Sequence, residues 1–345
     1  MTTGDNGSGR DSGTGACADY GRRRQPAALW LAAMALSLGA LGCGSQAEAT
    51  SAGAEAASGD ETPAAPLPPV EPAPLAADIA TAVAAVIEAP HRSDKHIARN
   101  VHRHPAETLA FMGLRQDMTV IELWPGGGWY TGVLAPVLRG RGKLVVGDSD
   151  PTDKRWGGGI RRLVERMAKQ RDVYGDVEVA RLAPPGSIEL GPDASADMVL
   201  TFRNVHNWMH SDSLSAVFAD AFRVLKPGGV FGVVEHRAAE GSDPAVSAKK
   251  GYVSEAYVIA IAEGVGFTLD ARSEINANPK DTRDHPKGVW TLPPVLSLKD
   301  QDRDRWLAIG ESDRMTLRFV KPGGPAAVAP PPPAAEAADT GAASP

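Results

Sequence analysis

The sequence predicts an α/β protein built on a doubly wound, mostly parallel sheet of seven strands, of which the last is antiparallel. Two observations carry this prediction. Between about residues 77 and 320, short runs rich in Val, Ile and Leu alternate with amphipathic stretches of helical period. Most of the short runs are apolar on consecutive residues, which is typical of parallel strands covered by helices on both faces.

Each element follows from its own local pattern. Pro105 suits the first turn of a helix and Gly113 suits its end. The KPGG sequence at 226–229 is expected to close the helix before the fifth strand, and the last two strands are expected to pair as an antiparallel edge. We expect strands at residues 119–124, 143–148, 177–182, 196–202, 230–236, 268–274 and 314–320. We expect helices at residues 77–89, 104–114, 129–139, 160–170, 213–225 and 254–266.

Residues 1–43 have the pattern of an export signal. A basic stretch at 21–24 precedes an apolar run at 26–42, and small residues then precede Cys43. The ALGC ending resembles the lipobox of bacterial lipoproteins, which implies a lipid on Cys43 that anchors an exported protein to the periplasmic side of a membrane. The other interpretations are an uncleaved anchor, a plain signal peptide, or a misassigned start that leaves the protein cytoplasmic.

Composition sets the remaining boundaries and excludes some functions. Residues 44–75 and 323–345 are rich in Ala and Pro and cannot bury enough apolar surface to fold, so we predict a linker and a tail around a domain at 76–322. A net charge of -6 without a basic stripe argues against nucleic-acid binding. With only two cysteines and irregularly spaced histidines at 91, 96, 102 and 104, we predict no metal site.

The glycines after the first predicted strand indicate a ligand site. In a doubly wound sheet, ligands bind at the carboxyl ends of the strands, and Gly126, Gly127 and Gly128 let a ligand approach the backbone there. Glu122 at the end of that strand suits a cationic amino group. Asp148, at the end of the second strand, can accept hydrogen bonds from ribose hydroxyls. A ligand that combines an amino acid, a sulfonium and a ribose is S-adenosylmethionine.

The order of these motifs resembles that of class I S-adenosylmethionine-dependent methyltransferases. Glu122-x-x-x-Gly126-x-Gly128 is followed by GDSDP, ADMVLTFRNVHNW and AFRVLKPGGVFGVVEH. More narrowly, RHPAETLAFMGL, ELWPGGGWYTGVLAP, FRNVHNW, GVWTLPP and GESDRMTLRFVKP resemble a little-characterised group of predicted bacterial methyltransferases. The resemblance, from about residue 92 to 322, implies a Rossmann-like methyltransferase fold and methyl transfer from S-adenosylmethionine to a small-molecule acceptor. Two departures are Trp124 in place of the first glycine, and LAPPGS where a polar residue normally meets the adenine.

The candidates for chemistry follow the fourth and fifth predicted strands. His206 and His236 are predicted to act as general bases, with Glu235 orienting a partner, and Asn204 is predicted to contact the cofactor. The polar segment between the last two strands, 276–312, is a candidate lid or substrate wall. The residues available to contact a polar substrate are Asn276, Asn278, Lys280, Asp281, Arg283, His285 and Trp290. The alternative is a surface loop packed for stability.

Two other functions stay open. A dehydrogenase would use a similar fold, but PGGGWY lacks the G-x-G-x-x-G spacing of dinucleotide sites. The alternative from a different class is an exported binding or structural lipoprotein that keeps a methyltransferase fold without turnover.

Overall fold

The computed structural model describes residues 68–69 and 77–323. The predicted signal peptide with Cys43, nearly all of the predicted linker, and the C-terminal tail after Gly323 lie outside these residues. Within the described ranges, no helix is both long and apolar enough to span a membrane.

Eight strands form one sheet in the described part of the chain, in the order β4-β3-β2-β1-β5-β6-β8-β7. The strands are β1 (Thr119–Leu123), β2 (Lys143–Asp148), β3 (Glu178–Leu182), β4 (Ile188–Glu189), β5 (Ala196–Phe202), β6 (Leu225–His236), β7 (Thr268–Ser273) and β8 (Arg314–Val320). Neighbours from β3 to β6 are parallel, whereas β8 is antiparallel to both β6 and β7. The predicted doubly wound, mostly parallel sheet with an antiparallel last strand is therefore confirmed.

The sheet differs from the prediction in two details. It has eight strands rather than seven, because the two-residue strand β4 pairs antiparallel with β3 through Arg181 and Leu182. The KPGG sequence does not form a separate turn. It lies inside β6 as an irregularity in the pairing with β5, and Gly228 donates its N–H to the carbonyl of Lys321. The predicted antiparallel edge is confirmed, because β7 and β8 pair antiparallel at that end of the sheet, with β7 outermost.

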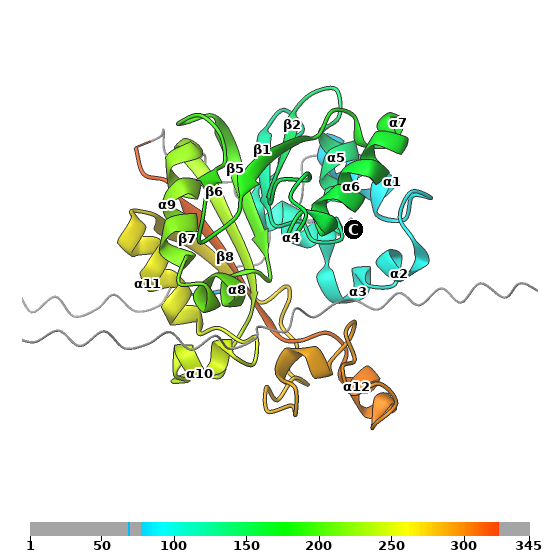
Figure 1. Ribbon diagram of the computed structural model, residues 1–345, viewed down its shortest axis with the longest axis vertical. Coiled ribbons are helices and arrows are strands. Elements are labelled where there is room, and N and C mark those ends of the chain that lie inside the picture. The colour runs from blue at the N-terminus through cyan, green and yellow to red at the C-terminus, as the bar shows by residue number, and fades with distance from the viewer. Residues whose placement is uncertain (1–67, 70–76, 324–345) are drawn as a thin grey trace, which may run out of the picture. The chain divides into compact units, whose positions relative to one another are not determined.

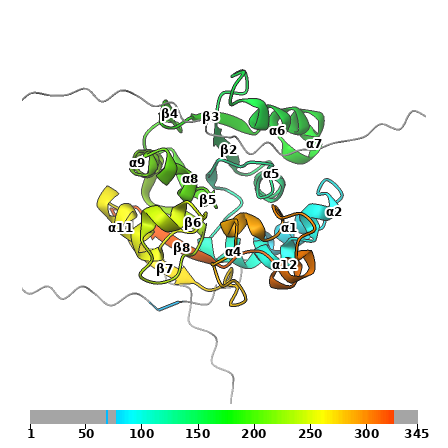
Figure 2. The same ribbon diagram turned by 60° about the horizontal axis from the view of Figure 1, so that its bottom comes forward.

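Helices cover the sheet on both sides, as Figure 2 shows. On one side lie α1 (Ala77–Ile87), α4 (Pro105–Met112), α5 (Thr131–Leu138), α6 (Gly158–Lys169) and α7 (Arg171–Tyr174). On the other side lie α8 (Val205–His210), α9 (Leu214–Val224) and α11 (Glu255–Val265). The connecting segments contain α2 (Asp94–Ile97), α3 (Asn100–Arg103), α10 (Pro244–Ala248), the 3₁₀ helix η1 (Gly288–Thr291) and α12 (Arg303–Ile309).

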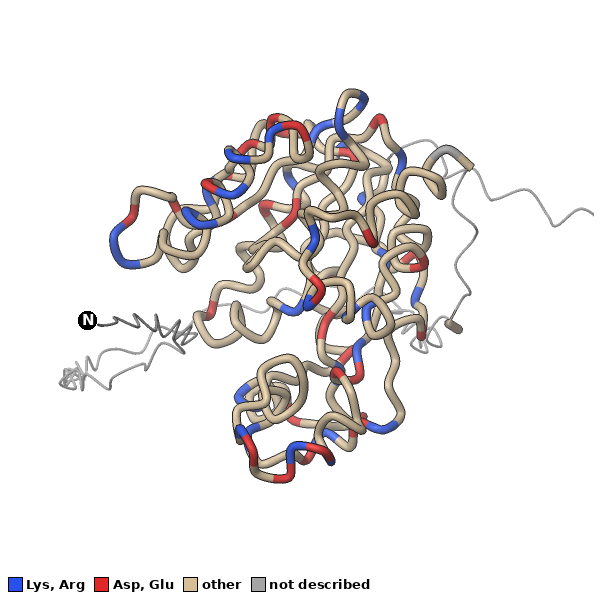
Figure 3. The backbone as a smooth tube through the Cα atoms, turned by 90° about the vertical axis from the view of Figure 1, so that its right-hand side faces the viewer, with Lys and Arg blue, Asp and Glu red and all other residues tan. Residues whose placement is uncertain are grey.

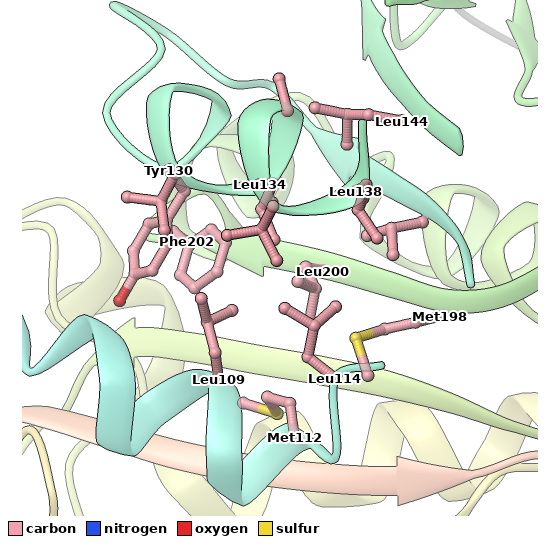
Figure 4. Close-up of a cluster of buried hydrophobic side chains, with 14 of the residues drawn as sticks. Leu109, Met112, Leu114, Tyr130, Leu134, Leu138, Leu144, Met198, Leu200 and Phe202 are labelled. Atoms are coloured by element: carbon pink, nitrogen blue, oxygen red, sulfur yellow. The ribbon is translucent and has the colours of Figure 1, made fainter. Parts of the chain in front are cut away.

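Alternating side chains of the central strands fill the two cores. Val120 of β1 packs with the α1, α4 and α5 side, whereas the next residue, Ile121, packs with the α8, α9 and α11 side. Figure 4 shows the first of these cores, in which leucines and methionines of α4 and α5 meet Met198, Leu200 and Phe202 of β5. Burial on both faces explains why these strands read as continuous apolar runs.

The chain order within the sheet determines where a ligand can bind. The chain builds β1, β2 and β3 outward and then returns to place β5 on the other side of β1. The loops that follow β1 and β5 therefore diverge and leave a crevice at the carboxyl ends of these strands. Figure 1 shows α8, α10 and α12 near the lower end of the sheet, with α2 and α3 beside them.

Candidate functional site

Two neighbouring cavities lie at this end of the sheet, and Gly126 and Gly127 line both. The first, of about 310 Å³, is bounded by the ends of β1, β5 and β6, by α2 and α3, and by the segment between β7 and β8. The second, of about 460 Å³, is bounded by the end of β2 and by α6. A ligand that lies across the two glycines reaches both cavities.

The glycine loop has two positions that require left-handed backbone. Gly126 and Gly128 have φ of 56° and 74°, where a side chain is unfavourable. A Cβ at Gly126 would meet nothing within 4 Å, but one at Gly128 would lie 2.6 Å from the Leu163 Cδ1 atom of α6. Gly128 lines neither cavity. The structure thus places Gly126 and Gly127 toward a ligand and gives Gly128 a packing role against α6.

Glu122 is a buried carboxyl group at the end of β1 and lines the first cavity. The Thr131 hydroxyl donates to its Oε2 atom at 2.6 Å. Burial raises the pKa of Glu122 to about 7, against the lowering effect of that hydrogen bond. Among the described residues, no Lys or Arg forms an ion pair with Glu122, so a ligand ammonium group would supply the positive charge that the site lacks.

Asp148 ends β2 and lines the second cavity, and its contact with a ribose stays a prediction. Burial raises its pKa to about 6, and its Oδ1 accepts the N–H of Ser149 at 2.6 Å. Trp156, which is 49% exposed, lines the same cavity. A carboxylate beside a flat aromatic face suits a nucleoside, because the carboxylate accepts from hydroxyls and the indole can stack on a base.

Trp124 stands where the methyltransferase pattern has its first glycine, and its backbone keeps a conformation that suits glycine. Its φ is 44°, a left-handed conformation that is costly for a bulky residue. The indole Nε1 donates to the carbonyl of Leu182 at 2.9 Å, and the ring packs 5.5 Å from that of Trp208. Trp124 therefore bridges the end of β1 and the end of β3, the region where the family resemblance implies an adenine contact. The space left for an adenine beside Asp148 is the second cavity, which Trp156 also lines.

His206 and Glu235 form a buried pair beside the first cavity. Glu235, on β6, accepts the backbone N–H of Val205 at 2.6 Å and that of His236 at 2.7 Å. Its Oε1 lies 3.1 Å from Nδ1 of His206, the second residue of α8. Because both Glu235 oxygens already accept backbone N–H groups, the contact with His206 is made by a proton on Nδ1, and the neutral ring then has its lone pair on Nε2. The structure brings together the two residues predicted to act as base and orienting group.

His236 lines the same cavity and is held by a different partner. Its Nδ1 lies 2.5 Å from the Ser312 hydroxyl, and its ring centre is 5.5 Å from that of His206. Burial, together with His206 and nearby arginines, lowers the pKa of His236 well below its usual value, so the ring is neutral at neutral pH. The roles of His206, Glu235 and His236 in catalysis stay predictions.

The same three residues are close enough to hold a cation. One ligand atom from each of His206, Glu235 and His236 lies within 4.8 Å of the others. The Glu235 oxygens, however, already accept two backbone hydrogen bonds and face His206 Nδ1. This arrangement favours a carboxylate that positions a histidine over one that binds a metal. The absence of a metal stays a prediction.

Asn204 is buried and supports the glycine loop. Its side-chain amide donates to the carbonyls of Leu123 and Trp124 at 2.9 and 3.3 Å, and to the Thr201 hydroxyl at 3.2 Å. Asn204 lines the first cavity, but its amide N–H groups are directed to the protein itself. The predicted cofactor contact therefore rests on its side-chain oxygen alone.

The segment between β7 and β8 forms an apolar wall of the first cavity. This wall consists of Val289, Trp290, Pro293, Pro294 and Val295. Its position agrees with the predicted substrate wall, and Trp290 lies 6.0 Å, centre to centre, from the ring of His206.

Several polar residues of that segment do not face the cavity. Asp281 is fully buried and accepts hydrogen bonds from the Tyr252 hydroxyl, the backbone N–H of Asp313 and His285 Nε2. Asn276 donates to two buried threonine hydroxyls. The prediction that these residues contact substrate is wrong, because their hydrogen bonds fold the segment onto the domain.

Sequence reasoning missed three cavity residues that precede β1. His96, Arg99 and Arg103 line the first cavity from α2 and α3. Arg99 and Arg103 are four residues apart and thus share a helical face, a signal visible in the sequence. Their proximity to the strand ends was not visible, because it depends on how the N-terminal segment packs over the sheet.

Comparison with known proteins gives one distant curated relative and a set of solved structures. No protein-family model matches the chain. Over 191 residues the chain is 27% identical to the sterol 24-C-methyltransferase of Yarrowia lipolytica; the match covers 51% of this chain and 46% of that enzyme, so the chain spans less than half of that relative.

Two solved structures have a similar arrangement. A SAM-dependent methyltransferase from Aquifex aeolicus is 16% identical, with a TM-score of 0.45 over 65% of this chain and 93% of that one. The [4+2]-cyclase SpnF is 13% identical, with a TM-score of 0.48 over 72% of this chain and 94% of that one. The narrower group of bacterial methyltransferases stays a prediction.

Proposed function

We propose that this protein transfers a methyl group from S-adenosylmethionine to a small-molecule acceptor. One observation carries the proposal. The cavity that contains Asp148 and the cavity that contains Glu122 and His206 meet at Gly126 and Gly127. A ligand with its ribose at Asp148 and its amino group at Glu122 crosses the glycines and directs its sulfonium toward the first cavity. The methyltransferases among the similar proteins support the same cofactor.

The side chains fit this cofactor in charge as well as in position. Burial raises the pKa of both Glu122 and Asp148, which indicates carboxyl groups without a cationic partner in the protein. A ligand with an ammonium group and two ribose hydroxyls provides the missing partners. When bound, S-adenosylmethionine supplies an electrophilic methyl group.

His206 is the residue that would move a proton. Glu235 holds its Nδ1–H at 3.1 Å, so Nε2 can accept a proton from a hydroxyl or another acidic group of the acceptor in the first cavity. Glu235 would also stabilise the imidazolium that forms. Trp290 and its apolar neighbours form a wall that excludes water from this cavity.

The proposal is tested first by cofactor binding. Isothermal titration calorimetry of the purified protein with S-adenosylhomocysteine should give saturable heat. The absence of heat and of a thermal shift at millimolar concentrations would refute the proposed cofactor.

Turnover is tested with S-adenosylmethionine carrying a labelled methyl group and pools of small-molecule acceptors. His206→Gln should lower the rate about 10²- to 10⁴-fold, the range for loss of a general base, while cofactor affinity is unchanged. His210→Gln is the matched control, because His210 is exposed on the same helix and lines neither cavity. Equal rates for wild type and His206→Gln would remove His206 from the reaction. Cofactor binding without transfer to any acceptor would favour the non-catalytic binding protein.

A further inference from the structure

One end of the first cavity gathers cationic side chains from distant parts of the chain. Arg99 and Arg103 come from the N-terminal boundary and the last residue of α3, and Arg203 follows β5. Arg314, at the start of β8, lies behind them and donates to Glu311 at 3.1 Å. Glu311 is the carboxylate that Arg99, Arg103 and Arg314 share.

The positive charges outnumber the carboxylates that neutralise them. Arg99, Arg103 and Arg314 all pair with Glu311, at 2.5, 3.3 and 3.1 Å. These cations hold the pKa of Glu311 well below its usual value, although burial acts in the opposite direction. Arg203 has no ion pair in the part of the chain that the structure describes. Even with the nearby Glu235 included, four guanidinium groups face two carboxylates.

In two of the guanidinium groups, one nitrogen also lacks a hydrogen-bond acceptor within the described chain. The Nη2 atoms of Arg99 and Arg103 are buried without a partner among the described residues. Arg103 is 2% exposed, and its guanidinium lies 4.6 Å from the centre of the Trp129 ring, so it is fixed in place. A buried donor without an acceptor costs about 1–3 kcal/mol, and such groups in a cavity wall are candidates for ligand contact.

Burial shifts the titration of this cluster in the direction expected for unpaired cations. It lowers the pKa of Arg203 to about 10 and that of Arg103 well below its usual value. Burial and the neighbouring arginines lower the pKa of His96 to about 4, so His96 is neutral and adds a donor without charge. An anion in the cavity would offset the cost of these desolvated guanidinium groups.

We propose that the acceptor is an organic acid whose carboxylate or phosphate group binds Arg99, Arg103 and Arg203 and whose apolar body packs against Trp290. This inference rests on the proposed function and names the acceptor class. The apolar wall lies in the same cavity as the arginines, so one small molecule of this kind satisfies both. Guanidinium groups bind planar carboxylates and phosphates through paired hydrogen bonds.

The cofactor's own carboxylate is the other source of an anion. It carries one negative charge, whereas the sulfonium and ammonium groups of the cofactor bring two positive charges into the same space. The cofactor thus increases the net positive charge of the site and leaves guanidinium groups unpaired. An acidic acceptor is what balances the cavity once the cofactor is bound.

Binding of simple anions tests this inference. Calorimetry would measure the binding of benzoate and of inorganic phosphate to the whole protein, with and without saturating S-adenosylhomocysteine, and neutral benzamide is the control ligand. We expect at least one anion to bind when S-adenosylhomocysteine is present, and benzamide to bind at least tenfold more weakly than benzoate. If S-adenosylhomocysteine abolishes anion binding, the arginines hold the cofactor's carboxylate and the inference is overturned. Failure of both anions to bind at tens of millimolar overturns it as well.

Arg203→Gln is the informative variant. Arg203 has φ of 64°, and because arginine and glutamine tolerate this conformation equally, the substitution adds no backbone strain. The substitution also removes no ion pair within the described chain. We expect anion affinity to fall at least tenfold. Arg99→Gln is a second variant with the same expectation, and Arg223→Gln, whose partners Asp193 and Asp220 lie outside both cavities, is the control. Unchanged anion affinity in both Arg203→Gln and Arg99→Gln would refute the inference. Anion binding without any S-adenosylhomocysteine binding would instead refute the proposed function and leave the anion site intact.

Discussion

Replacing Glu122 with glutamine should stabilise the ligand-free protein at alkaline pH. The folded-state pKa of Glu122 is about 7, above the ordinary value of 4.5, because the group is buried. A carboxyl group of this kind binds its proton more tightly in the folded state, so stability is greatest below pH 4.5 and falls as the pH rises toward 7. The difference between these pKa values corresponds to a loss of about 3 kcal/mol, which is fully developed above pH 7.

Glutamine has the same shape, keeps an oxygen that can accept from Thr131, and does not ionise. Urea unfolding at two pH values would measure the effect. Glu122→Gln should exceed wild type by about 3 kcal/mol near pH 8 and by about 1 kcal/mol near pH 5.5. Exposed Glu165→Gln is the control and should leave the pH dependence of unfolding unchanged. A variant as unstable as wild type near pH 8 would show that the Glu122 carboxylate is not penalised by burial.

The same substitution should have the opposite effect on the cofactor. An ionised Glu122 attracts the ammonium group of S-adenosylhomocysteine, so wild-type affinity should rise as the pH increases through 7. In Glu122→Gln that rise should disappear and affinity near pH 8 should fall. Affinity that is equal in the two proteins at both pH values would remove Glu122 from the cofactor site, whatever its effect on stability.

Three further predictions concern the cofactor site and the N-terminus. Asp148→Asn should weaken S-adenosylhomocysteine binding by about 1–3 kcal/mol in calorimetry, because ribose hydroxyls lose a charged acceptor. Gly128→Ala should lower the free energy of unfolding in urea more than Gly126→Ala, since both residues have positive φ but only a Cβ at Gly128 would clash with Leu163 of α6. Equal losses of stability would show that the Leu163 side chain moves aside. Membrane attachment through Cys43 predicts that Cys43→Ser leaves the protein unprocessed, and mass spectrometry of wild type with an intact, unmodified N-terminus would contradict it.

The predictable part of the fold is the part governed by local pattern and burial. Runs such as those of β1, β2 and β5 are apolar on consecutive residues because helices cover both faces of the sheet. Their bounds agree with the prediction to within one residue at each end. The two-residue β4 has no such pattern. The KPGG stretch has the composition of a turn, but Leu225 before it and Val230 after it pair with β5, and Gly228 and Gly229 hydrogen-bond to the backbone of Lys321, so it lies inside β6.

The sequence predicts those residues of the candidate site that lie at the carboxyl ends of strands. Glu122, Asp148 and Glu235 lie near the carboxyl ends of β1, β2 and β6, and the parallel arrangement brings such ends to one edge. Arg103 reaches the cavity from before the first strand, and this could not be read from the sequence. Asp281 is an error of the opposite kind. A polar residue in a loop is expected to face solvent or substrate, but Asp281 is buried and its hydrogen bonds are made within the protein.

The charges around the first cavity explain why the empty site should destabilise the protein and the loaded site should not. Glu122 is a buried carboxyl group without a cation, and Arg103 and Arg203 are desolvated cations with too few anions. They do not neutralise one another, since no ion pair joins Glu122 to either arginine in the described chain. The buried carboxyl group of Glu122 would therefore pair with the cofactor's ammonium group, and the arginines would pair with the acidic group of the acceptor. Folding leaves these charges partly unpaired, and binding pairs them, so cofactor and acceptor together should stabilise the protein more than either ligand alone.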